Sequence, residues 1–352
     1  MHADPAYWSG RTVCVTGGTG FLGCHLVRLL GDAGANVRVF APDAPADHPV
    51  RRLNRAEIIA GDVLDLAAVR KAVSGCSVVI HAAGVVAVRG PAASNAWPVH
   101  VDGTRHVLAA IEPGARLVHT SSVVAVGASR RRDVLSEESS FEIGRIKLDY
   151  VQSKRAAEDL VLSSAKDVVV VNPSFLIGPE DHDRSVMGQF CHRFWRGRVP
   201  VVPPGGLNLV DVRDAAAGHL LAAERGQRGR RYILGGEDHD YRSFLTLLAE
   251  VAGFRPRWLP GIPRPLFTAL AAVNEVHARL RGREPFPSLG HVRLNRWYWF
   301  FSSDRARQEL GYDPRPVRNS LADAYDWFAS RESLRPRGLN RWLLRPTSPP
   351  TT

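Results

Sequence analysis

Short apolar runs alternate with amphipathic helical patterns through the first half of the chain. The runs are rich in Val and Ile and are bounded by Gly, Asn or Asp, which predicts buried strands. We expect strands at 13–15, 36–40, 57–60, 77–81, 116–121 and 168–171, and helices at 21–30, 66–73, 99–111 and 147–163. This regular alternation predicts an α/β fold, a doubly wound parallel sheet of the Rossmann type with helices on both faces.

The pattern changes after residue 174, where Pro and Gly separate shorter elements. Strands at 207–212 and 231–234 flank a helix at 214–224, and amphipathic helices are expected at 241–253 and 264–281. We assign residues 8–173, with a returning segment 207–235, to a sheet domain, and residues 174–206 and 236–330 to a smaller C-terminal domain. The aromatic run 297–301 is expected to pack in a core, because no consistent basic groove flanks it.

The turn after the first strand carries the strongest chemical signal. It reads Thr16-Gly-Gly-Thr-Gly-Phe-Leu-Gly23, and the first helix begins at Phe21 and Leu22. Glycines at 17, 20 and 23 adopt backbone angles that other residues resist and let a phosphate approach the main chain. Free N–H groups and the positive end of the helix dipole would then face a pyrophosphate. This segment therefore predicts a bound dinucleotide.

Composition is that of a globular protein. The chain has 352 residues, of which 45% are hydrophobic and 23% charged, and no apolar run approaches the roughly 20 residues that cross a bilayer. The first residues lack the basic and apolar regions of a secretory signal. Four scattered cysteines, Cys14, Cys24, Cys76 and Cys191, have no metal-ligand spacing. We therefore expect buried reduced thiols, no metal and a cytoplasmic location.

The net charge of +11 does not by itself indicate a nucleic-acid partner. The basic residues are mostly arginines spread along the chain among Asp and Glu, so we expect no nucleic-acid binding. Their one local concentration is the tail, residues 331–352, where arginines stand among Pro, Leu and Trp342. We expect a flexible extension there, and peripheral contact with an acidic membrane surface is the alternative.

Tyr150 and Lys154 lie four residues apart on the helix predicted after the fifth strand, so their side chains share one helix face. An ammonium there stabilises a tyrosinate and lowers the phenol pKa from about 10. A phenol tuned in this way passes a proton to or from a substrate oxygen. Lysine is rare in this chain, and arginine would serve this compact role less well. The alternative is an ordinary pair on a helix surface.

Polar residues also end three predicted strands, at the sheet edge where such folds bind ligands. Ser122 closes the fifth strand and would hydrogen-bond a reacting carbonyl or alcohol beside Tyr150. Asp62 follows the third strand and is placed to accept from an adenine amine, unless it only forms the turn. Asn172 and Ser174 end the sixth strand, where simple termination by the intervening proline is an equally good interpretation.

Together these segments resemble the extended short-chain dehydrogenase/reductases, a superfamily of NAD-dependent epimerase/dehydratase-like proteins. The likeness rests on the glycine turn, Gly61-Asp62, His81-Ala-Ala-Gly84, Thr120-Ser-Ser122 and Tyr150-x-x-x-Lys154. The segment Asn172-Pro-Ser-Phe-Leu-Ile-Gly-Pro179 is similar to the branch of dihydroflavonol reductases and 3β-hydroxysteroid dehydrogenases, which also holds hopanoid-associated sugar epimerases. Ser121-Ser122 replaces the Asp-Glu pair of sugar dehydratases, which argues against dehydration.

The resemblance implies a role for each matching residue. It places Gly17, Gly20, Phe21, Leu22 and Gly23 at the pyrophosphate, Asp62 and Val63 at the adenine, Ala82, Ala83 and Gly84 at the ribose side, Asn172 and Ser174 near the nicotinamide, and Ser122, Tyr150 and Lys154 in catalysis, with Lys154 also on the nicotinamide ribose.

Two positions depart from the family pattern. His100 stands where the family usually has Asn, and an imidazole cannot copy the simultaneous donor and acceptor fork of an amide. The family's relay or water site therefore does not carry over directly to this position. After the second strand, Ala41-Pro-Asp43 offers neither an acid for the NAD ribose nor an arginine for the NADP phosphate. The missing acid favours NADP slightly, with candidate partners Arg38, Arg51, Arg52 and Arg55.

The resemblance implies an NAD(P)-dependent oxidoreductase that moves hydride between the nicotinamide and a carbonyl or secondary alcohol. A hydrophobic small-molecule substrate is favoured by the apolar residues Phe175, Leu176, Phe190 and Trp195 and the helix 266–273. Two alternatives stay open, a nucleotide-sugar epimerase with tightly bound NAD and a non-catalytic dinucleotide-binding protein. Family members often form homodimers through two helices of the sheet domain.

Overall fold

The computed structural model describes residues 3–53, 55–86, 96–145, 148–182, 185–199, 201–256, 260–281, 285–334 and 344–346. Within these ranges seven parallel strands form the larger sheet, in the order β3-β2-β1-β4-β5-β7-β10. They are β1 (Thr12–Thr16), β2 (Asn36–Ala41), β3 (Ala56–Ala60), β4 (Val78–His81), β5 (Arg116–Thr120), β7 (Val168–Pro173) and β10 (Arg231–Leu234). The predicted Rossmann-type sheet is confirmed, and its strand order reverses between β1 and β4, where such sheets bind ligands.

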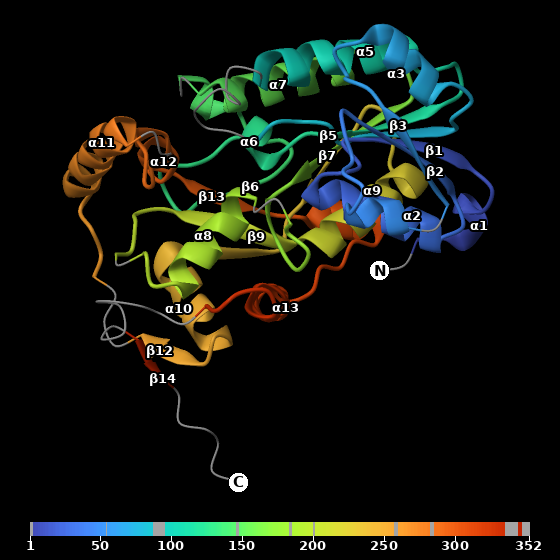
Figure 1. Cartoon of the computed structure of the whole chain (residues 1–352). Helices are drawn as coiled ribbons and strands as arrows, with labels where there is room; N and C mark the ends of the chain where they lie inside the picture. Colours follow the sequence, from blue (N-terminus) through green and yellow to red (C-terminus); the bar gives the residue numbers. More distant parts are fainter. Residues whose placement is uncertain are drawn as a thin grey trace.

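Helices cover both faces of this sheet (Figure 1). One face carries α3 (Leu66–Val73), α5 (Gly103–Ala110) and α7 (Asp149–Leu162), and the other carries α2 (Phe21–Asp32) and α9 (Val212–Arg225). Successive residues of β1 alternate between the two cores: Val13 and Val15 join the core under α2 and α9, and Cys14 joins the opposite one. Because both faces of the central strands are buried, their sequences read as continuous apolar runs.

A second, smaller sheet takes its strands from distant parts of the chain. It contains β6 (Val134–Leu135), β8 (Phe175–Ile177), β9 (Gly206–Asp211), β11 (Glu237–Asp240) and β13 (Tyr298–Phe301). Helices α8 (Val186–Trp195), α10 (Tyr241–Val251) and α13 (Val317–Ala329) pack around it in one apolar core. Trp299 and Phe301 are buried there, so the predicted packing of the aromatic run is confirmed. Of the segment 207–235, β10 joins the larger sheet and β9 the smaller one.

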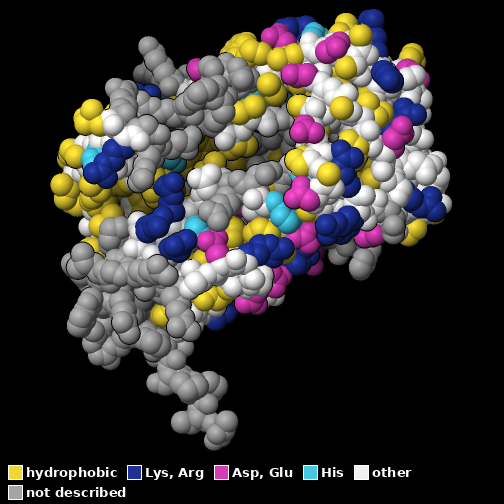
Figure 2. Space-filling view, in the orientation of Figure 1, with side chains coloured by type: hydrophobic (Ala, Val, Ile, Leu, Met, Phe, Trp, Pro, Cys, Tyr) yellow, Lys and Arg dark blue, Asp and Glu magenta, His cyan; other side chains and the backbone are white. Residues whose placement is uncertain are grey.

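The remaining elements connect or flank these layers. They are α1 (Pro5–Trp8), η1 (Pro49–Arg52), η2 (Pro98–Asp102), α6 (Val123–Val126), η3 (Glu142–Arg145), α11 (Arg264–Leu280), α12 (Leu289–Leu294) and η4 (Ala306–Leu310). Helix α11 forms the end of the molecule at the left of Figure 1, and Figure 2 shows hydrophobic side chains on the surface there.

The tail takes part in one strand pair. Strand β12 (Phe254–Pro256) pairs antiparallel with β14 (Leu344–Pro346), and residues 335–343 and 347–352 lie outside the described residues. Among the helices that the structure describes, none has the length and hydropathy to span a bilayer. The described ranges also contain no group of three His, Cys, Asp or Glu placed to hold a metal ion. All four cysteines are free and buried, as the sequence predicted.

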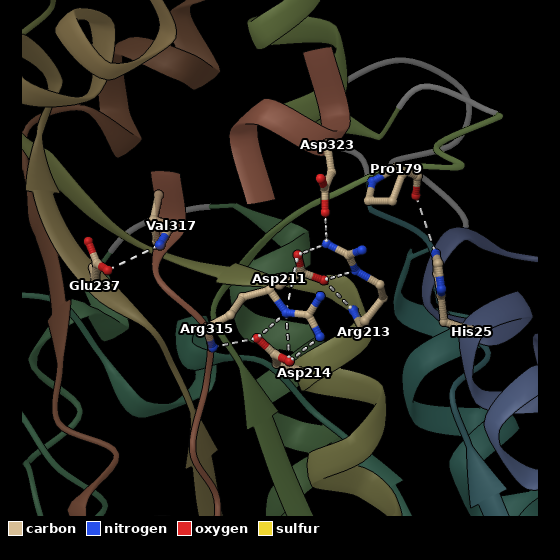
Figure 3. A network of polar contacts seen from close by, with 9 residues as sticks. All are labelled: His25, Pro179, Asp211, Arg213, Asp214, Glu237, Arg315, Val317 and Asp323. Carbon is tan, nitrogen blue, oxygen red and sulfur yellow. Dashed lines mark hydrogen bonds and ion pairs between the residues drawn. The ribbon is translucent and has the colours of Figure 1, made fainter. Parts of the chain in front are cut away.

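Ion pairs fix α13 to the start of α9 (Figure 3). Asp211 caps α9 and accepts from the Arg213 backbone N–H at 2.8 Å and from its Nε at 2.9 Å. Arg213 also donates to Asp323 of α13 at 2.5 Å, and Arg315 donates to Asp214 from Nε at 3.0 Å and Nη2 at 2.9 Å. Burial raises the pKa of Asp211, but the hydrogen bonds and charge of Arg213 outweigh burial and hold the pKa below its ordinary value. This network joins the helices of the two sheets.

Candidate active site

The glycine turn after β1 has different surroundings at Gly17, Gly20 and Gly23, the three glycines of the predicted motif. Gly17 has a φ of +69°, and a Cβ there would lie 2.7 Å from the Ala83 Cα, so glycine is required. A Cβ on Gly23 would lie 2.2 Å from the Gly17 carbonyl oxygen, so glycine lets α2 pack against the turn. At Gly20 a Cβ would meet only that same oxygen, at 3.4 Å. The turn is thus closely packed on one side and open at Gly20, as backbone binding of a phosphate requires.

Helix α2 begins at this open position. Gly20 caps the helix without a side-chain hydrogen bond, and Phe21 and Leu22 are its first two residues. The N–H groups of a first helical turn have no partner within the helix, and the helix dipole attracts an anion to them. The free backbone N–H groups, the helix start without a side-chain cap and the open position at Gly20 together fit the pyrophosphate of a dinucleotide.

The segment that follows β4 lies between the glycine turn and helix α7. The backbone of Ala83 lies against Gly17, as the short distance above shows. One residue further, a Cβ on Gly84 would lie 3.2 Å from His100 Nε2 and 3.4 Å from Lys154 Nζ. The structure therefore brings the predicted ribose-side segment between the glycine turn and the predicted catalytic lysine.

Asp62 and Val63 follow β3. Asp62 is exposed, and its Oδ1 accepts from the Leu64 backbone N–H at 3.0 Å, so the carboxylate forms the turn. Val63 is buried over Gly103, where a Cβ would lie 2.9 Å from Val63 Cγ2. The turn-forming role of Asp62 is therefore present, and contact of either residue with an adenine stays a prediction.

Ser122, Tyr150 and Lys154 lie together where β5 meets α7. Ser122 lies beside Tyr150, and its hydroxyl favours the ionised form of the phenol. Lys154 lies one turn further along α7, is buried, and donates from Nζ to the Thr120 carbonyl at 3.0 Å. Ser122 also caps α6, where its hydroxyl accepts from the Val124 N–H at 3.4 Å. A hydroxyl, a phenol and an ammonium are therefore gathered in one place, which suits proton transfer at a substrate oxygen.

Burial dominates the titration of Tyr150 and Lys154. It raises the pKa of the Tyr150 phenol, and the hydroxyl of Ser122 opposes this only in part. It lowers the pKa of Lys154 to about 8, although the Glu158 carboxylate favours the charged ammonium. The lowering of the Tyr150 pKa that the spacing predicted is therefore not found in this structure. The Lys154 ammonium donates to the Thr120 carbonyl, and it is not among the groups that shift the pKa of Tyr150.

His100 links the loop after β4 to α7. Its Nε2 accepts from the Val85 N–H at 3.0 Å, so its Nδ1 carries the proton and donates to Ser153 Oγ at 2.8 Å. Burial and the positive charge of Lys154 lower the pKa of His100 to about 2, which keeps the ring neutral. The ring lies 5.8 Å from that of Tyr150. An imidazole cannot offer a donor and an acceptor side by side as an amide does. This neutral ring instead accepts from Val85 at one nitrogen and donates to Ser153 of α7 at the other, and so it positions α7.

Sequence reasoning missed Glu158, which lies one turn beyond Lys154 on α7. Its carboxylate is fully buried and accepts from Ser121 Oγ at 2.5 Å, Asn172 Nδ2 at 2.6 Å and Arg231 Nη1 at 2.9 Å. These partners come from the ends of β5 and β7 and from the start of β10. The repeated spacing of four after Tyr150 and Lys154 was the one sequence signal that could have indicated it. Glu158 is the centre of the polar contacts behind the catalytic side chains.

Asn172 acts in the same network. Its Nδ2 also donates to the Ser122 carbonyl at 3.0 Å, so the amide positions the backbone of that serine. Within the described structure, Asn172 Oδ1 and Ser174 Oγ are buried without a hydrogen-bond partner. Such unpaired oxygens are uncommon in protein interiors and are suited to a ligand that donates to them. Contact with a nicotinamide stays a prediction for both residues.

Replacing Glu158 with Gln tests the network. The variant keeps the shape of the side chain but leaves the mostly buried Arg231 without its counter-charge, so we expect the free energy of unfolding to fall by about 3 kcal/mol. Urea denaturation measures this loss. The matched control is Asp159→Asn, because Asp159 is half-exposed and pairs with Arg155 on the helix surface, where such pairs contribute about 0.5 kcal/mol. Equal losses in both variants would contradict a special role for Glu158.

Three further buried histidines lie near the site. His81 on β4 makes hydrogen bonds to threonine hydroxyls at both ring nitrogens, and His219 on α9 bonds to Thr120 Oγ1 at 3.0 Å. His119 on β5 lies 5.4 Å from the His81 ring, and neither of its nitrogens has a partner among the described residues. Burial lowers the pKa of His81 to about 3 and of His219 to about 4, and that of His119 well below its ordinary value. These rings are therefore neutral in the folded protein.

Comparison with known proteins agrees with this geometry. Residues 13–235 match the NAD dependent epimerase/dehydratase family. A protein named "Putative dihydroflavonol 4-reductase" from Synechocystis sp. is 33% identical over 344 residues, which cover 92% of this chain and 96% of that protein. Sterol demethylase protein B of Methylococcus capsulatus is 34% identical over 331 residues, 91% of this chain and 99% of that protein.

A solved structure shows the same likeness in three dimensions. The crystal structure of gox2253 superposes with a TM-score of 0.79 at 31% identity and covers 93% of this chain and 100% of that one. The family match takes in every strand of the larger sheet and both segments that hold the glycine turn and the Tyr150–Lys154 pair. The chain therefore belongs to the NAD dependent epimerase/dehydratase family of enzymes.

Proposed function

We propose that this enzyme is an NAD(P)-dependent dehydrogenase or reductase that moves hydride between the nicotinamide and a carbonyl or secondary alcohol. The observation that carries this proposal is the placement of Ser122 beside Tyr150, with Lys154 one helical turn away and beside the Gly84 loop. When bound, the nicotinamide cofactor supplies or accepts the hydride. The residues of this chain then have to manage the proton and the charge on the substrate oxygen.

Each of the three side chains has one task in that chemistry. In the direction of reduction, Tyr150 donates its phenolic proton to the substrate oxygen as that oxygen gains negative charge. Ser122 donates a hydrogen bond to the same oxygen and stabilises the developing charge. Lys154, which lies beside the Gly84 loop and donates to the Thr120 carbonyl, holds the nicotinamide ribose. In the direction of oxidation the tyrosinate takes the proton of the alcohol.

The surroundings of Tyr150 favour a hydrophobic substrate. Phe175, Phe190, Tyr241 and Phe286 are partly buried on the same apolar cluster as Tyr150. Aromatic side chains of this kind bind apolar ligands through their large contact area. The name of the Methylococcus relative, a sterol demethylase protein, points to the same class of compound.

Two residue groups expected to line the substrate lie elsewhere. Trp195 is buried in the core, where its Nε1 donates to the Leu248 carbonyl at 2.9 Å. Leu266 and Val273 of α11 face solvent, with 59% and 69% of their surface exposed. The apolar pattern of the sequence identified these residues as hydrophobic but could not show which surface each one faces.

We further propose that the cofactor is NADP. The end of β2 is the buried Ala41, which offers no carboxylate to the ribose hydroxyls of NAD. Arg38 and Arg55 donate to carbonyls in the loops before β4 and β2, at the opposite edge of the sheet. Arg51 and Arg52 are exposed in η1, which follows β2, and are the remaining candidates for the 2′-phosphate.

A carbonyl-reduction assay with the full chain tests the proposal. We expect hydrophobic ketones, such as steroid ketones, to oxidise NADPH faster than NADH, measured by loss of nicotinamide absorbance. Ser122→Ala should lower turnover by about 100-fold, because one donor to the reacting oxygen is lost. The exposed Ser330 provides the control variant Ser330→Ala, which should keep wild-type turnover. Epimerisation of a sugar nucleotide without net absorbance change, together with no ketone reduction, would contradict the proposal and favour an epimerase.

A further inference from the structure

Helix α11 carries an apolar stripe that faces solvent. Among the described residues, five of the nine exposed large hydrophobic side chains lie on this one helix, and their exposed fractions run from 44% to 82%. At 3.6 residues per turn they share one face, which takes up about a third of the helix circumference. The stripe consists of Leu266, Leu270, Val273, Val276 and Leu280.

The opposite face of α11 is already packed. Phe267 and Ala271 are buried and form a small core with Val292 of α12. Glu275 is also buried, and its Oε2 accepts from the Leu289 backbone N–H at 3.3 Å. The helix is therefore held to the protein through its inner face, and the stripe on its outer face stays exposed to solvent. Exposed apolar surface of this extent on one helix indicates a binding face.

The charges around the stripe identify what it binds. In residues 260–281 and 285–296 the described acidic side chains comprise Glu275 alone, which is 5% exposed. Exposed arginines stand at both ends of α11, namely Arg264 and Arg281, and Arg293 and Arg296 lie on and just after the neighbouring α12. Figure 2 shows dark-blue side chains beside the yellow ones at this end of the molecule. An apolar stripe on a helix with arginines at both ends, in a segment whose one described acid is buried, complements an anionic lipid surface.

A second copy of the chain is a poorer fit to the same surface. In a two-fold symmetric contact the same patch meets itself, so antiparallel α11 helices would bring Arg264 of one copy near Arg281 of the other. Like charges placed in this way oppose association. An anionic bilayer instead offers phosphates to the arginines and acyl chains to the stripe.

We propose that α11 docks this enzyme on the surface of an anionic lipid bilayer, with the stripe in the boundary between headgroups and acyl chains. Phe286, shortly after α11, lies 6.2 Å from Phe190 of the apolar cluster between ring centroids, so the segment after α11 is joined to the core of the smaller sheet. The docking needs no chemistry at Tyr150, so it is independent of the proposed function.

Vesicle co-sedimentation of the full chain tests this proposal. The probes are vesicles of phosphatidylcholine alone and vesicles of phosphatidylcholine and phosphatidylglycerol in equal parts. We expect the chain to pellet with the mixed vesicles and much less with the neutral ones. Val273→Glu places a charge in the stripe and should weaken binding by at least about tenfold. Val134→Glu is the matched control, because Val134 is 57% exposed on β6 and should leave binding unchanged.

Three results would overturn the docking proposal. The first is no binding of the wild-type chain to the mixed vesicles, and the second is equal binding by wild type and Val273→Glu. The third is a dimer in sedimentation velocity, without vesicles, that Val273→Glu converts to a monomer, since a second copy would then cover the stripe. Tyr150→Phe should bind vesicles as the wild type does, which separates a failure of docking from a failure of the proposed reaction.

Discussion

Tyr150→Phe is expected to lower turnover by about 10²–10⁴-fold, the contribution of a positioned general acid. The substitution removes one hydroxyl and keeps the ring, which packs against the apolar core of the smaller sheet. Dinucleotide affinity and folding stability should therefore change little. Steady-state kinetics with a hydrophobic ketone measures turnover, and fluorescence titration with the cofactor measures affinity.

The matched control removes a tyrosine hydroxyl at a distance from the site. Tyr7 on α1 donates its hydroxyl to the Ala223 carbonyl at 3.1 Å, so Tyr7→Phe loses one hydrogen bond of the same kind. We expect this variant to keep wild-type turnover. Equal activity of Tyr150→Phe and wild type would exclude Tyr150 as the proton donor, whereas loss of cofactor binding would show that the phenol mainly holds the dinucleotide.

The larger sheet was predictable because its signals are local. Strand β1 and helix α2 were placed almost at their observed bounds, since an apolar run and a glycine break are read from adjacent residues. The smaller sheet was not predicted as a unit. Its central strand β9 pairs with β8, β11 and β13, and these come from segments far apart in the sequence. Strand partners at such separations depend on the tertiary fold and not on any local pattern.

At the site, too, local features were predictable from the sequence and long-range contacts were not. The spacing of Tyr150 and Lys154 predicted their shared helix face, but it could not show where the ammonium points, and so the direction of the Tyr150 pKa shift was wrong. Glu158 was missed because its importance depends on partners from β7 and β10. The two-domain division, a homodimer and the cytoplasmic location stay predictions.

Acidification from neutrality to about pH 5 is expected to remove most of the folding stability. Burial holds four histidines neutral in the folded protein. It lowers the pKa of His81 to about 3, of His100 to about 2 and of His219 to about 4, and it lowers the pKa of His119 well below its ordinary value. The unfolded chain binds protons on them near pH 6.5, so stability falls with pH below that value by about 1.4 kcal/mol per unit for each ring. As the pH falls further, the free energy of unfolding keeps decreasing until the pH reaches the pKa values of these rings in the folded protein.

The three rings with pKa values of about 4 or lower account for about 6 kcal/mol at pH 5, against a typical total of 5–15 kcal/mol, and His119 adds to this loss. Asp211 adds nothing in this window, because its pKa is held below the ordinary value near 4 and its ion pair is lost only at lower pH. Urea denaturation across this pH range measures the slope.

His119→Leu isolates one ring of the four. Neither nitrogen of His119 has a partner among the described residues, so an apolar side chain of similar size should leave the stability at neutral pH unchanged or higher. Below pH 6.5 the variant should lose stability less steeply, by about 1.4 kcal/mol per pH unit. His277→Gln is the matched control for the loss of an imidazole, because His277 is exposed on α11 and is not one of the buried rings. A slope in His119→Leu equal to that of the wild type would mean that the ring is already protonated in the folded protein, and burial would then not be what makes this fold sensitive to acid.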